Sequence, residues 1–347
     1  MIAVPENPGP VRLMPFYSMQ YEAATWHTAP AISSATRNLV LVHRRGAIDI
    51  ADLQRIRELV HERAPDIEVF IAHSRSPCSV TARHAARRPS LVFSPARNKK
   101  FVPRGGKVYG PVSIGKLEQA RRLQAAGIAV PETIAFDTHT SLDPATWGPL
   151  TVVKPDSSGS GKDVEIWRTR ELSGKRPLWP ENDRRRGKAM IAQKFIDTGR
   201  HPAKYRLLAL FGRPIYCEEQ ASVEPAPAFD PEGTGAIDGL VTTLASSAAT
   251  AGTRRNTVCN DEDVLRLAPL VASAFPETSV LGLDVLREAS SGKLYVLEIN
   301  SEGSTWHLSS WLGKIAQRRQ NIDRYAQFDA LSVAADALID KTRAEAE

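Results

Sequence analysis

The segment that most constrains this chain is a pair of apolar runs, Val280–Arg287 and Lys293–Asn300, joined by a few polar residues. Side chains on such runs point alternately to opposite faces, so the pattern predicts a β-hairpin. We place the centre of its turn at Ser291. The cross-strand pairs on one face are then apolar: Leu283 with Ile299, and Val285 with Leu297.

The other face of this hairpin carries a polar set. Asp284 lies directly opposite Glu298, and Asn300 points to the same side as Glu298. Two facing carboxylates repel each other, and a divalent cation between them removes the repulsion. Carboxylate and amide oxygens without His or Cys suit Mg²⁺. The pattern therefore predicts a metal site formed by Asp284, Glu298 and Asn300.

A solvated outer face is the alternative interpretation of the same hairpin. Arg287 and Lys293 would share that face in water. A shift of one residue in the strand pairing would also place the two carboxylates on opposite sides of the sheet. The spacing by itself leaves both interpretations open.

A candidate phosphate-binding loop begins at the end of the apolar strand Leu150–Lys154. The loop Pro155–Lys162 follows at once and is rich in Ser and Gly. Backbone N–H groups of such loops bind phosphate, and a lysine adds a point charge. The loop has neither the Gly-Lys-Ser/Thr ending of a Walker P-loop nor the helix that follows the glycines of a dinucleotide site. A flexible hairpin tip is the alternative.

Two further strands carry candidate binding groups. The strand end Gln193–Ile196 offers backbone groups to a purine edge, although an ordinary buried strand has the same pattern. Arg206 is placed to neutralise charge on a transferred phosphoryl group. A tight hairpin at Gly212–Arg213 would instead set Arg206 opposite Glu219 as an ion pair.

Arg254 and Arg255 follow a long segment, 221–253, that is rich in Ala, Gly, Ser, Thr and Pro. A connection of this length inside a compact domain is usually functional or mobile. The two arginines are therefore candidates for phosphate contact, with solvated loop charges as the alternative.

The region 35–112 has the pattern of a small α/β domain. Apolar strands at Asn38–His43 and Glu68–Ala72 flank a helical repeat over Asp49–Arg63, and Leu91–Phe93 adds a third strand. This order of strand, helix and strand predicts a parallel sheet.

Three helices are expected further along the chain. The first runs from a cap at Ser113 to Gly127, where a left-handed residue ends it. The second spans Asp261–Phe275, and Pro269 either kinks it or marks a later start. The third is an amphipathic helix in the tail that follows Ile322.

Charge and composition exclude several classes of protein. The net charge of +6 comes from 45 basic and 39 acidic residues, but no zinc-finger or RNA-binding signature accompanies it, so we expect no nucleic-acid partner. No apolar run reaches the length of a membrane span and no secretory signal pattern is present, so we expect no membrane partner. Cys78, Cys217 and Cys259 lie far apart in sequence and suit a reducing cytoplasm.

Taken in order, the segments between Gly115 and Trp306 resemble the ATP-grasp superfamily, with ribosomal-protein glutamate ligases, glutathione synthetases and D-alanine–D-alanine ligases as the nearest members. The likeness covers a little over half of the chain. The segments that carry it are Gly115-Lys116-Leu117 with Ala126–Pro131, Lys154-Pro155 with the Ser/Gly loop, Gln193-Lys194-Phe195-Ile196, Tyr205-Arg206, Arg254-Arg255-Asn256, and the set Asp284, Glu298 and Asn300.

The resemblance implies an α/β (α+β) ATP-grasp fold, in which two α+β lobes hold ATP between them. A small parallel-sheet domain precedes the two lobes in the chain. The implied division is an N-terminal extension (1–34), a pre-ATP-grasp domain (35–112), an N-terminal lobe with the mobile phosphate loop (113–190), and a C-terminal lobe with the metal site and the terminal helix (191–347).

The resemblance also implies roles for residues. The residues implied to bind ATP are Lys116, Lys154, Ser158, Gly159, Gln193, Lys194, Phe195 and Ile196. Asp284, Glu298 and Asn300 would hold Mg²⁺, with Mn²⁺ as an alternative ion. Arg206 and Arg255 would act in catalysis.

The implied activity is a ligase reaction. ATP would convert a small-molecule carboxylate into an acyl phosphate, which an amine or thiol acceptor then attacks. Relatives are commonly dimers, so a homodimer is one expected assembly. The alternatives are a kinase of the same fold acting on a small-molecule alcohol, and a non-catalytic module that binds ATP. Retention of both lysines, the metal ligands and Arg206 favours an enzyme over the module.

The chain departs from the family pattern at three places. Lys194 stands where such ligases often carry Glu, and Lys204 where they often carry Asp. Ser301–Ser304 is a near match to Ser-x-x-Gly with the glycine shifted. The second departure puts in doubt the contact with ribose or an amino substrate, and the third the acceptor site.

Overall fold

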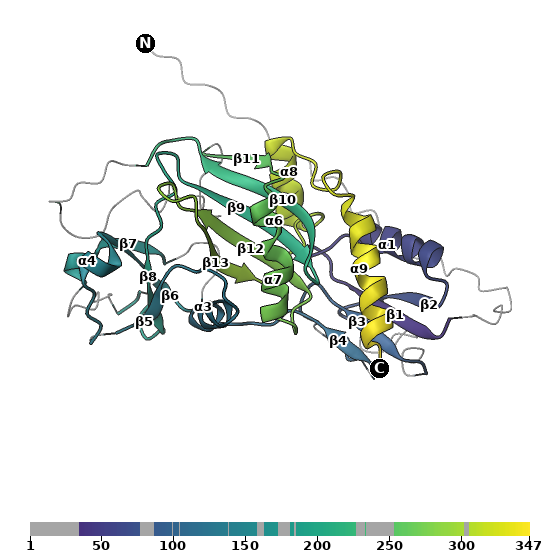
Figure 1. Cartoon of the computed structure of the whole chain (residues 1–347). Helices are drawn as coiled ribbons and strands as arrows, with labels where there is room; N and C mark the ends of the chain where they lie inside the picture. Colours follow the sequence, from purple (N-terminus) through teal and green to yellow (C-terminus); the bar gives the residue numbers. More distant parts are fainter. Residues whose placement is uncertain are drawn as a thin grey trace, which may run out of the picture. The chain divides into compact units, whose positions relative to one another are not determined.

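The computed structural model describes the chain from residue 35 onward, with gaps (Figure 1). The described ranges are 35–76, 87–98, 100–103, 105–137, 139–157, 163–172, 181–183, 185–226, 233, 253–301 and 305–347. Every described residue belongs to one compact unit, residues 34–347. The expected extension 1–34 lies outside the described residues.

The first sheet is parallel and has the strand order β2-β1-β3-β4. Its strands are β1 (Arg37–His43), β2 (Ile67–His73), β3 (Ser90–Phe93) and β4 (Lys107–Tyr109). Helix α1 (Ile50–Arg63) connects β1 to β2, and the Asp49 side chain caps it by accepting from the N–H of Ala51. The predicted α/β class and the parallel pairing of this region are confirmed.

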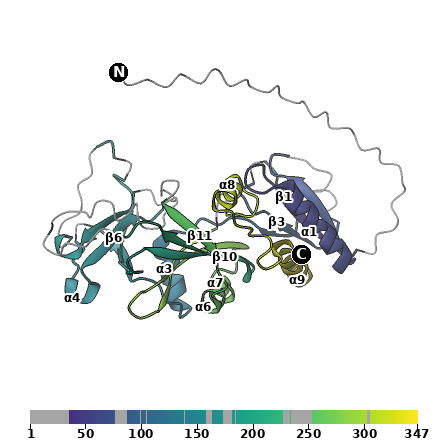
Figure 2. The ribbon, with the colours of Figure 1, turned by 90° about the horizontal axis from the view of Figure 1, so that it is seen from above.

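The C-terminal helix α9 (Ala330–Glu345) packs against α1 and the first sheet, as Figures 1 and 2 both show. Leu338 of α9 is buried in the same apolar cluster as Leu39 of β1. Arg63 of α1 binds Asp336 of α9 at 2.8 Å. The helix that we expected within the C-terminal lobe therefore also covers the N-terminal sheet.

The second sheet is antiparallel and has the order β5-β8-β6-β7. Its strands are β5 (Thr133–Phe136), β6 (Leu150–Pro155), β7 (Glu165–Arg168) and β8 (Met190–Lys194). Helix α3 (Lys116–Ala125) precedes β5, and the short helix α4 (Pro144–Trp147) precedes β6. Because β8 pairs with both β5 and β6, a lobe boundary at 190/191 would fall inside a strand of this sheet.

The third sheet is antiparallel and has the order β11-β10-β9-β12-β13. Its strands are β9 (Ala203–Leu210), β10 (Arg213–Ser222), β11 (Arg254–Val258), β12 (Val280–Arg287) and β13 (Leu294–Asn300). The predicted hairpin of β12 and β13 is present.

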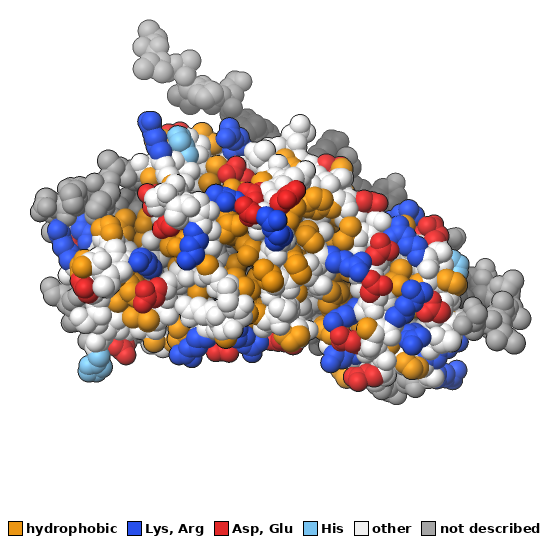
Figure 3. All heavy atoms as spheres, viewed as in Figure 1, with side chains coloured by type: hydrophobic (Ala, Val, Ile, Leu, Met, Phe, Trp, Pro, Cys, Tyr) orange, Lys and Arg blue, Asp and Glu red, His pale blue; other side chains and the backbone are white. Residues whose placement is uncertain are grey.

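Strand β9 is covered on both faces, which explains its continuous apolar run. Leu208 and Leu210 join the cluster under α9 and the first sheet. Leu207 and Ala209 join a second cluster with α3, α6 (Glu262–Leu265) and α7 (Leu267–Ala274). On the outside, hydrophobic side chains gather over α6 and α7 (Figure 3).

The turn between β9 and β10 lies one residue earlier than expected. Phe211 and Gly212, at φ 48° and 82°, both have the positive φ of a type I′ turn. The prediction had centred the hairpin on Gly212–Arg213. The aromatic Phe211 tolerates this conformation inside a turn whose flanking strands are buried.

A bulge after this turn changes the strand register. The pairing shifts between Pro214 and Tyr216, where proline has no N–H for the ladder. The earlier turn alone would pair Arg206 with Cys217, and the bulge shifts this pairing by one residue, so Arg206 lies opposite Glu218 and not opposite Glu219. The alternative interpretation of Arg206, an ion pair with Glu219, is therefore wrong.

The boundaries of two expected helices also differ. Helix α3 begins at Lys116 with Gly115 as its N-cap, so Ser113 does not cap it, whereas Gly127 ends it at φ 74° as predicted. The expected helix 261–275 is two helices that meet at Arg266, and Pro269 lies in the first turn of α7.

Two of the three cysteines are neighbours in space. The N–H of Cys259 donates to the carbonyl of Cys217 at 3.0 Å, and both thiols are free. Their separation in sequence hid this contact, and Cys78 lies outside the described residues. In the part of the chain that the structure describes, no helix combines the length and apolar character needed to cross a bilayer.

The turn at Gly212 yields a stability prediction. An alanine there would enter the left-handed region and crowd Cβ of Ala272 at 3.1 Å and Cα of Pro269 at 3.2 Å. Gly292→Ala is a matched control, because Gly292 has φ 71° but open space around it. Both variants should lose about 1–2 kcal/mol from backbone strain, and Gly212→Ala about 1–3 kcal/mol more from crowding. Urea denaturation measures both, and equal losses would contradict the crowding.

Candidate active site

The paired carboxylates lie where the hairpin pattern predicted them. Asp284 is directly opposite Glu298, and Asn300 is opposite Gly282 on the same pair of strands. A bulge follows Asp284, so Val285 pairs with Val296 and not with Leu297 as expected. Asp284 is buried, whereas Glu298 and Asn300 are partly exposed.

Two cations hold the Asp284 carboxylate. Arg206 lies opposite Asp284 on the neighbouring strand β9 and donates to Oδ1 at 2.6 Å. Lys204, two residues earlier on the same face of β9, donates to Oδ2 at 3.1 Å. Burial alone would raise the pKa of Asp284, but Arg206 and Lys204 outweigh it and hold that pKa well below its ordinary range.

Two lysines from other elements approach the same carboxylates. Lys116, the first residue of α3, lies with Nζ 3.8 Å from Oε2 of Glu298. Lys154 of β6 is buried, and burial lowers the pKa of Lys154 to about 8, with Glu298 and Asp284 acting in the opposite direction. Three elements distant in sequence thus bring Lys116, Lys154 and Glu298 together.

Gly115 is required for the position of Lys116. A Cβ at Gly115 would come within 2.3 Å of Oδ2 of Asp156. That side chain accepts from the N–H of Leu117 at 2.8 Å, and the Asp156 carbonyl accepts from the N–H of Lys116. Asp156, which directly follows β6, therefore caps α3 and joins the two elements that carry the lysines.

In the segment expected to receive the purine, the side chains of Gln193 and Lys194 point to opposite sides of the strand. Gln193 is buried, accepts from Lys154 Nζ at 2.8 Å and donates to the Thr133 hydroxyl. Lys194 points the other way and donates to the carbonyl of Thr146 at 3.0 Å. Its neighbours Phe195 and Ile196 are half-buried and buried, respectively. Ser158 and Gly159 lie outside the described residues.

The two arginines after the long loop are separated by strand alternation. Arg254 and Asn256 share one face of β11, and Nε of Arg254 donates to Oδ1 of Asn256 at 3.0 Å. Burial and the neighbouring Arg324 and Arg206 lower the pKa of Arg254, against Glu218 and Asp284. Arg255 is exposed on the opposite face, so the structure does not bring it to the other candidates.

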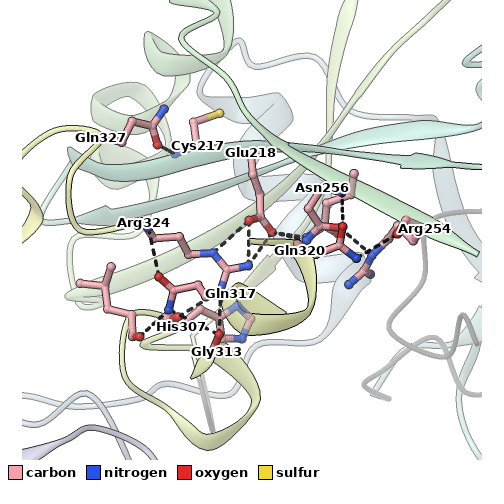
Figure 4. Close-up of polar contacts among 12 residues, drawn as sticks. Cys217, Glu218, Arg254, Asn256, His307, Gly313, Gln317, Gln320, Arg324 and Gln327 are labelled. Carbon is pink, nitrogen blue, oxygen red and sulfur yellow. Dashed lines mark hydrogen bonds and ion pairs between the residues drawn. The ribbon is translucent and has the colours of Figure 1, made fainter. Parts of the chain in front are cut away.

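A buried ion pair supports this face of the sheet (Figure 4). Glu218 of β10 accepts from Nε and Nη2 of Arg324 at 2.9 and 2.8 Å, and from Nδ2 of Asn256 at 3.1 Å. Arg324 also donates to the carbonyl of His307 at 3.1 Å. Burial, Arg206 and Arg324 lower the pKa of His307 well below its ordinary value.

No local pattern identified the Glu218–Arg324 pair, because its members lie 106 residues apart. Arg254 did have a signal. Arg254 and Asn256 are two residues apart, so they share a face once the segment is a strand. We had predicted no strand at these residues, and the alternation was therefore not applied.

The donor set has the right chemistry for a hard cation. Glu298 and Asn300 offer carboxylate and amide oxygens at the partly exposed end of the hairpin. Asp284 adds a second carboxylate, but both of its oxygens already accept from cations. Within the described ranges, no group of three or more His, Cys, Asp and Glu residues is placed to hold a metal ion. Glu298 and Asn300 are thus the residues that fit Mg²⁺ best.

Comparison with known proteins gives matches only among solved structures. No family model matches the chain, and no curated protein matches it. The ATP-grasp ligase PsnB in complex with a minimal precursor is 16% identical, with 88% of this chain and 99% of that chain covered and a TM-score of 0.48. The D-cycloserine synthetase DcsG is also 16% identical, with 88% of this chain and 99% of that chain covered and a TM-score of 0.48.

A third structure is the D-alanine–D-alanine ligase of Bacillus anthracis, which is 15% identical, with 89% of this chain and 98% of that chain covered and a TM-score of 0.44. All three are similar to this chain over most of its length. Because their TM-scores stay below 0.5, we take neither activity nor substrate from them.

The buried pair yields a stability prediction. Arg324→Met would leave Glu218 as an uncompensated buried charge, which should cost about 3–5 kcal/mol of unfolding free energy. Arg343→Met is the control, because Arg343 pairs with Asp66 at the surface, and such pairs contribute about 0–1 kcal/mol. Urea denaturation of both variants measures the difference. Similar small losses would show that Glu218 finds other partners.

Proposed function

We propose that this chain is an ATP-grasp enzyme, which binds Mg-ATP and activates a substrate carboxylate. The observation that supports this most is the convergence of Lys116, Lys154 and Glu298 from three elements, beside the buried Asp284–Arg206 pair. Cations from two lobes and a carboxylate from one of them are what polyphosphate and its metal ion require. The domains expected at 35–112, 113–190 and 191–347 belong to this proposal, with β8 moved to the first ATP-grasp lobe.

In this proposal the lysines hold the nucleotide phosphates. Lys154 lies at the end of β6, next to the loop that contains Ser158 and Gly159, and Lys116 starts the adjacent helix. The low pKa of Lys154 reflects burial without enough negative charge, so a bound phosphate would favour its charged form. The segment Gln193–Ile196 would receive the adenine ring.

Glu298 and Asn300 would hold Mg²⁺, which neutralises phosphate charge and aligns the γ-phosphate. A substrate carboxylate oxygen then attacks the γ-phosphorus, and the bond to the β-phosphate oxygen breaks to release ADP. An amine or thiol attacks the acyl carbon, and inorganic phosphate leaves. Arg206 and Arg254 lie on the face where charge develops, and they would stabilise it.

A ligase is favoured over the two alternatives by the charges that are retained. A module that only binds ATP has no need of Arg206 anchored on a buried carboxylate. A kinase for a phosphorylated alcohol would need a dense basic pocket, for which residues 83–104 were the candidates. Within that range, residues 83–86, 99 and 104 lie outside the described residues, and the described Arg88 donates to Glu68 of the N-terminal domain.

The first test is nucleotide binding by the purified chain. A non-hydrolysable ATP analogue at 100 times its dissociation constant should stabilise the fold by ~2.7 kcal/mol, and Mg²⁺ should increase the effect. Lys154→Met should abolish this shift in melting temperature, because the variant lacks the phosphate cation. Lys293→Met is the control, since Lys293 lies on the exposed hairpin turn. Absence of any shift with the native protein would contradict the proposal.

Release of inorganic phosphate then separates the reaction classes. A ligase should release phosphate from ATP only when both a carboxylate and an acceptor are present. A kinase would form ADP and a phosphorylated alcohol without releasing phosphate. Binding without turnover for any substrate panel would support the regulatory module.

The orientation of β11 yields a prediction about catalysis. Arg254→Ala should lower turnover about 10²-fold, as loss of one transition-state donor commonly does. Arg255→Ala should leave turnover within a factor of about two, because Arg255 faces away from the site. Steady-state kinetics with saturating ATP compares them, and the reverse ranking would restore Arg255 as the catalytic residue.

A further inference from the structure

We propose that Lys204 and Arg206, anchored on Asp284, occupy the position where Asp284 would otherwise bind a divalent ion, so that the site takes a single divalent ion through Glu298 and Asn300. In this arrangement Asp284 is a positioning residue for two fixed cations and not a metal ligand. The inference rests on the proposed nucleotide function and specifies which side chains replace a metal ion in it.

The arrangement begins with the strand order. Strand β12 lies between β9 and β13, so Asp284 has Arg206 on one side and Glu298 on the other. The Asp284 carboxylate points toward β9, where Arg206 donates to Oδ1 at 2.6 Å and Lys204 donates to Oδ2 at 3.1 Å. Each oxygen of Asp284 therefore already binds a positive charge on the side away from Glu298.

The cluster of Asp284, Lys204 and Arg206 is largely shielded from solvent. The Asp284 side chain is 4% exposed, and those of Lys204 and Arg206 are 15% and 12% exposed. Burying a charged group is costly unless a partner of opposite charge is present, and Asp284 is the acid that Lys204 contacts. An Asp at position 204, which the family pattern often has, would repel Asp284, and a cation would be needed to hold both. Lys204 supplies that charge from the chain.

The balance of charge points the same way. Lys116, Lys154, Lys204 and Arg206 carry +4, and Asp284 and Glu298 carry −2, which leaves +2 before any ligand binds. A divalent ion on Asp284 would add two charges beside Lys204 and Arg206. The anionic nucleotide compensates for one divalent ion in this site more readily than for two.

Glu298 remains accessible to an ion. Its side chain is 24% exposed, and the nearest cation, Lys116, lies at 3.8 Å, beyond hydrogen-bond length. Asn300 is also partly exposed, on the same side of β13. The metal position is thus on the partly exposed strand β13, whereas Asp284, directly opposite Glu298, is buried.

The test counts ions directly. Mn²⁺ binding to the full chain, with a non-hydrolysable ATP analogue present, is followed by the electron paramagnetic resonance signal of free Mn²⁺. We expect one nucleotide-dependent ion per chain. Glu298→Gln should weaken it more than about tenfold, as loss of metal-site groups does, whereas Asp284→Asn should change the affinity less than about threefold.

The second measurement asks whether a variant gains a second Mn²⁺ site. Lys204→Met removes the fixed charge and frees Oδ2 of Asp284, so this variant should bind two ions per chain, while the control Lys293→Met should bind one. The Lys204→Met variant also tests the inference if Asp284→Asn fails to fold. Melting curves of Asp284→Asn show whether it folds.

Three results would overturn the inference. They are two ions in the native protein, a loss in Asp284→Asn as large as that in Glu298→Gln, or one ion in Lys204→Met. Failure of the proposed function itself has a different signature, since the native protein would then show no nucleotide-dependent binding of Mn²⁺.

Discussion

The pairing of β9 with β12 at the centre of the third sheet is the constraint on which the rest of the structure depends. The second half of β9 and most of β12 are buried, by the first sheet with α9 on one side and by α3, α6 and α7 on the other. A strand buried in this way has one permitted register, because a one-residue slip would exchange its two sets of side chains. That register places Arg206, Asp284 and Glu298 in one row across three strands.

The buried carboxylate in this row is stabilised because the neighbouring strand β9 supplies two cations. Burial penalises each charge separately, so Asp284 is stabilised by Arg206 and Lys204 while Lys154 remains under-compensated. An under-compensated lysine beside a partly exposed carboxylate supports the proposed binding of an anionic ligand with its own cation. Under that proposal, the burial that lowers the pKa of Lys154 would favour the ligand.

The segment after β13 ties the site to the N-terminal domain through neutral and charged donors. Asp52 of α1 is buried and accepts from the Trp306 indole at 2.8 Å and the Tyr325 hydroxyl at 3.0 Å. Arg324, one residue before Tyr325, binds Glu218 on the face that carries Arg254. Two buried acids, Asp52 and Glu218, thus hold this segment in place.

The sequence by itself determined the elements and the polar row of the hairpin. Alternation on β12 and β13 gave Asp284 opposite Glu298, the order of strand, helix and strand gave the parallel sheet, and the lysine at the end of β6 was recognised from its loop. These features depend on neighbours in the chain or on one short turn, so local periodicity was enough to find them.

Only the tertiary structure decided which charges meet. The earlier turn at Phe211 and Gly212, together with the bulge after Pro214, set Arg206 opposite Glu218 and not Glu219, strand alternation in β11 turned Arg254 inward instead of Arg255, and Arg324 reached Glu218 across 106 residues. A bulge shifts every later pair by one residue, and a contact between distant segments leaves no periodic trace in either of them. The physical reason is that burial and charge compensation depend on the whole packed structure, whereas a sequence pattern reports only the face on which a side chain lies.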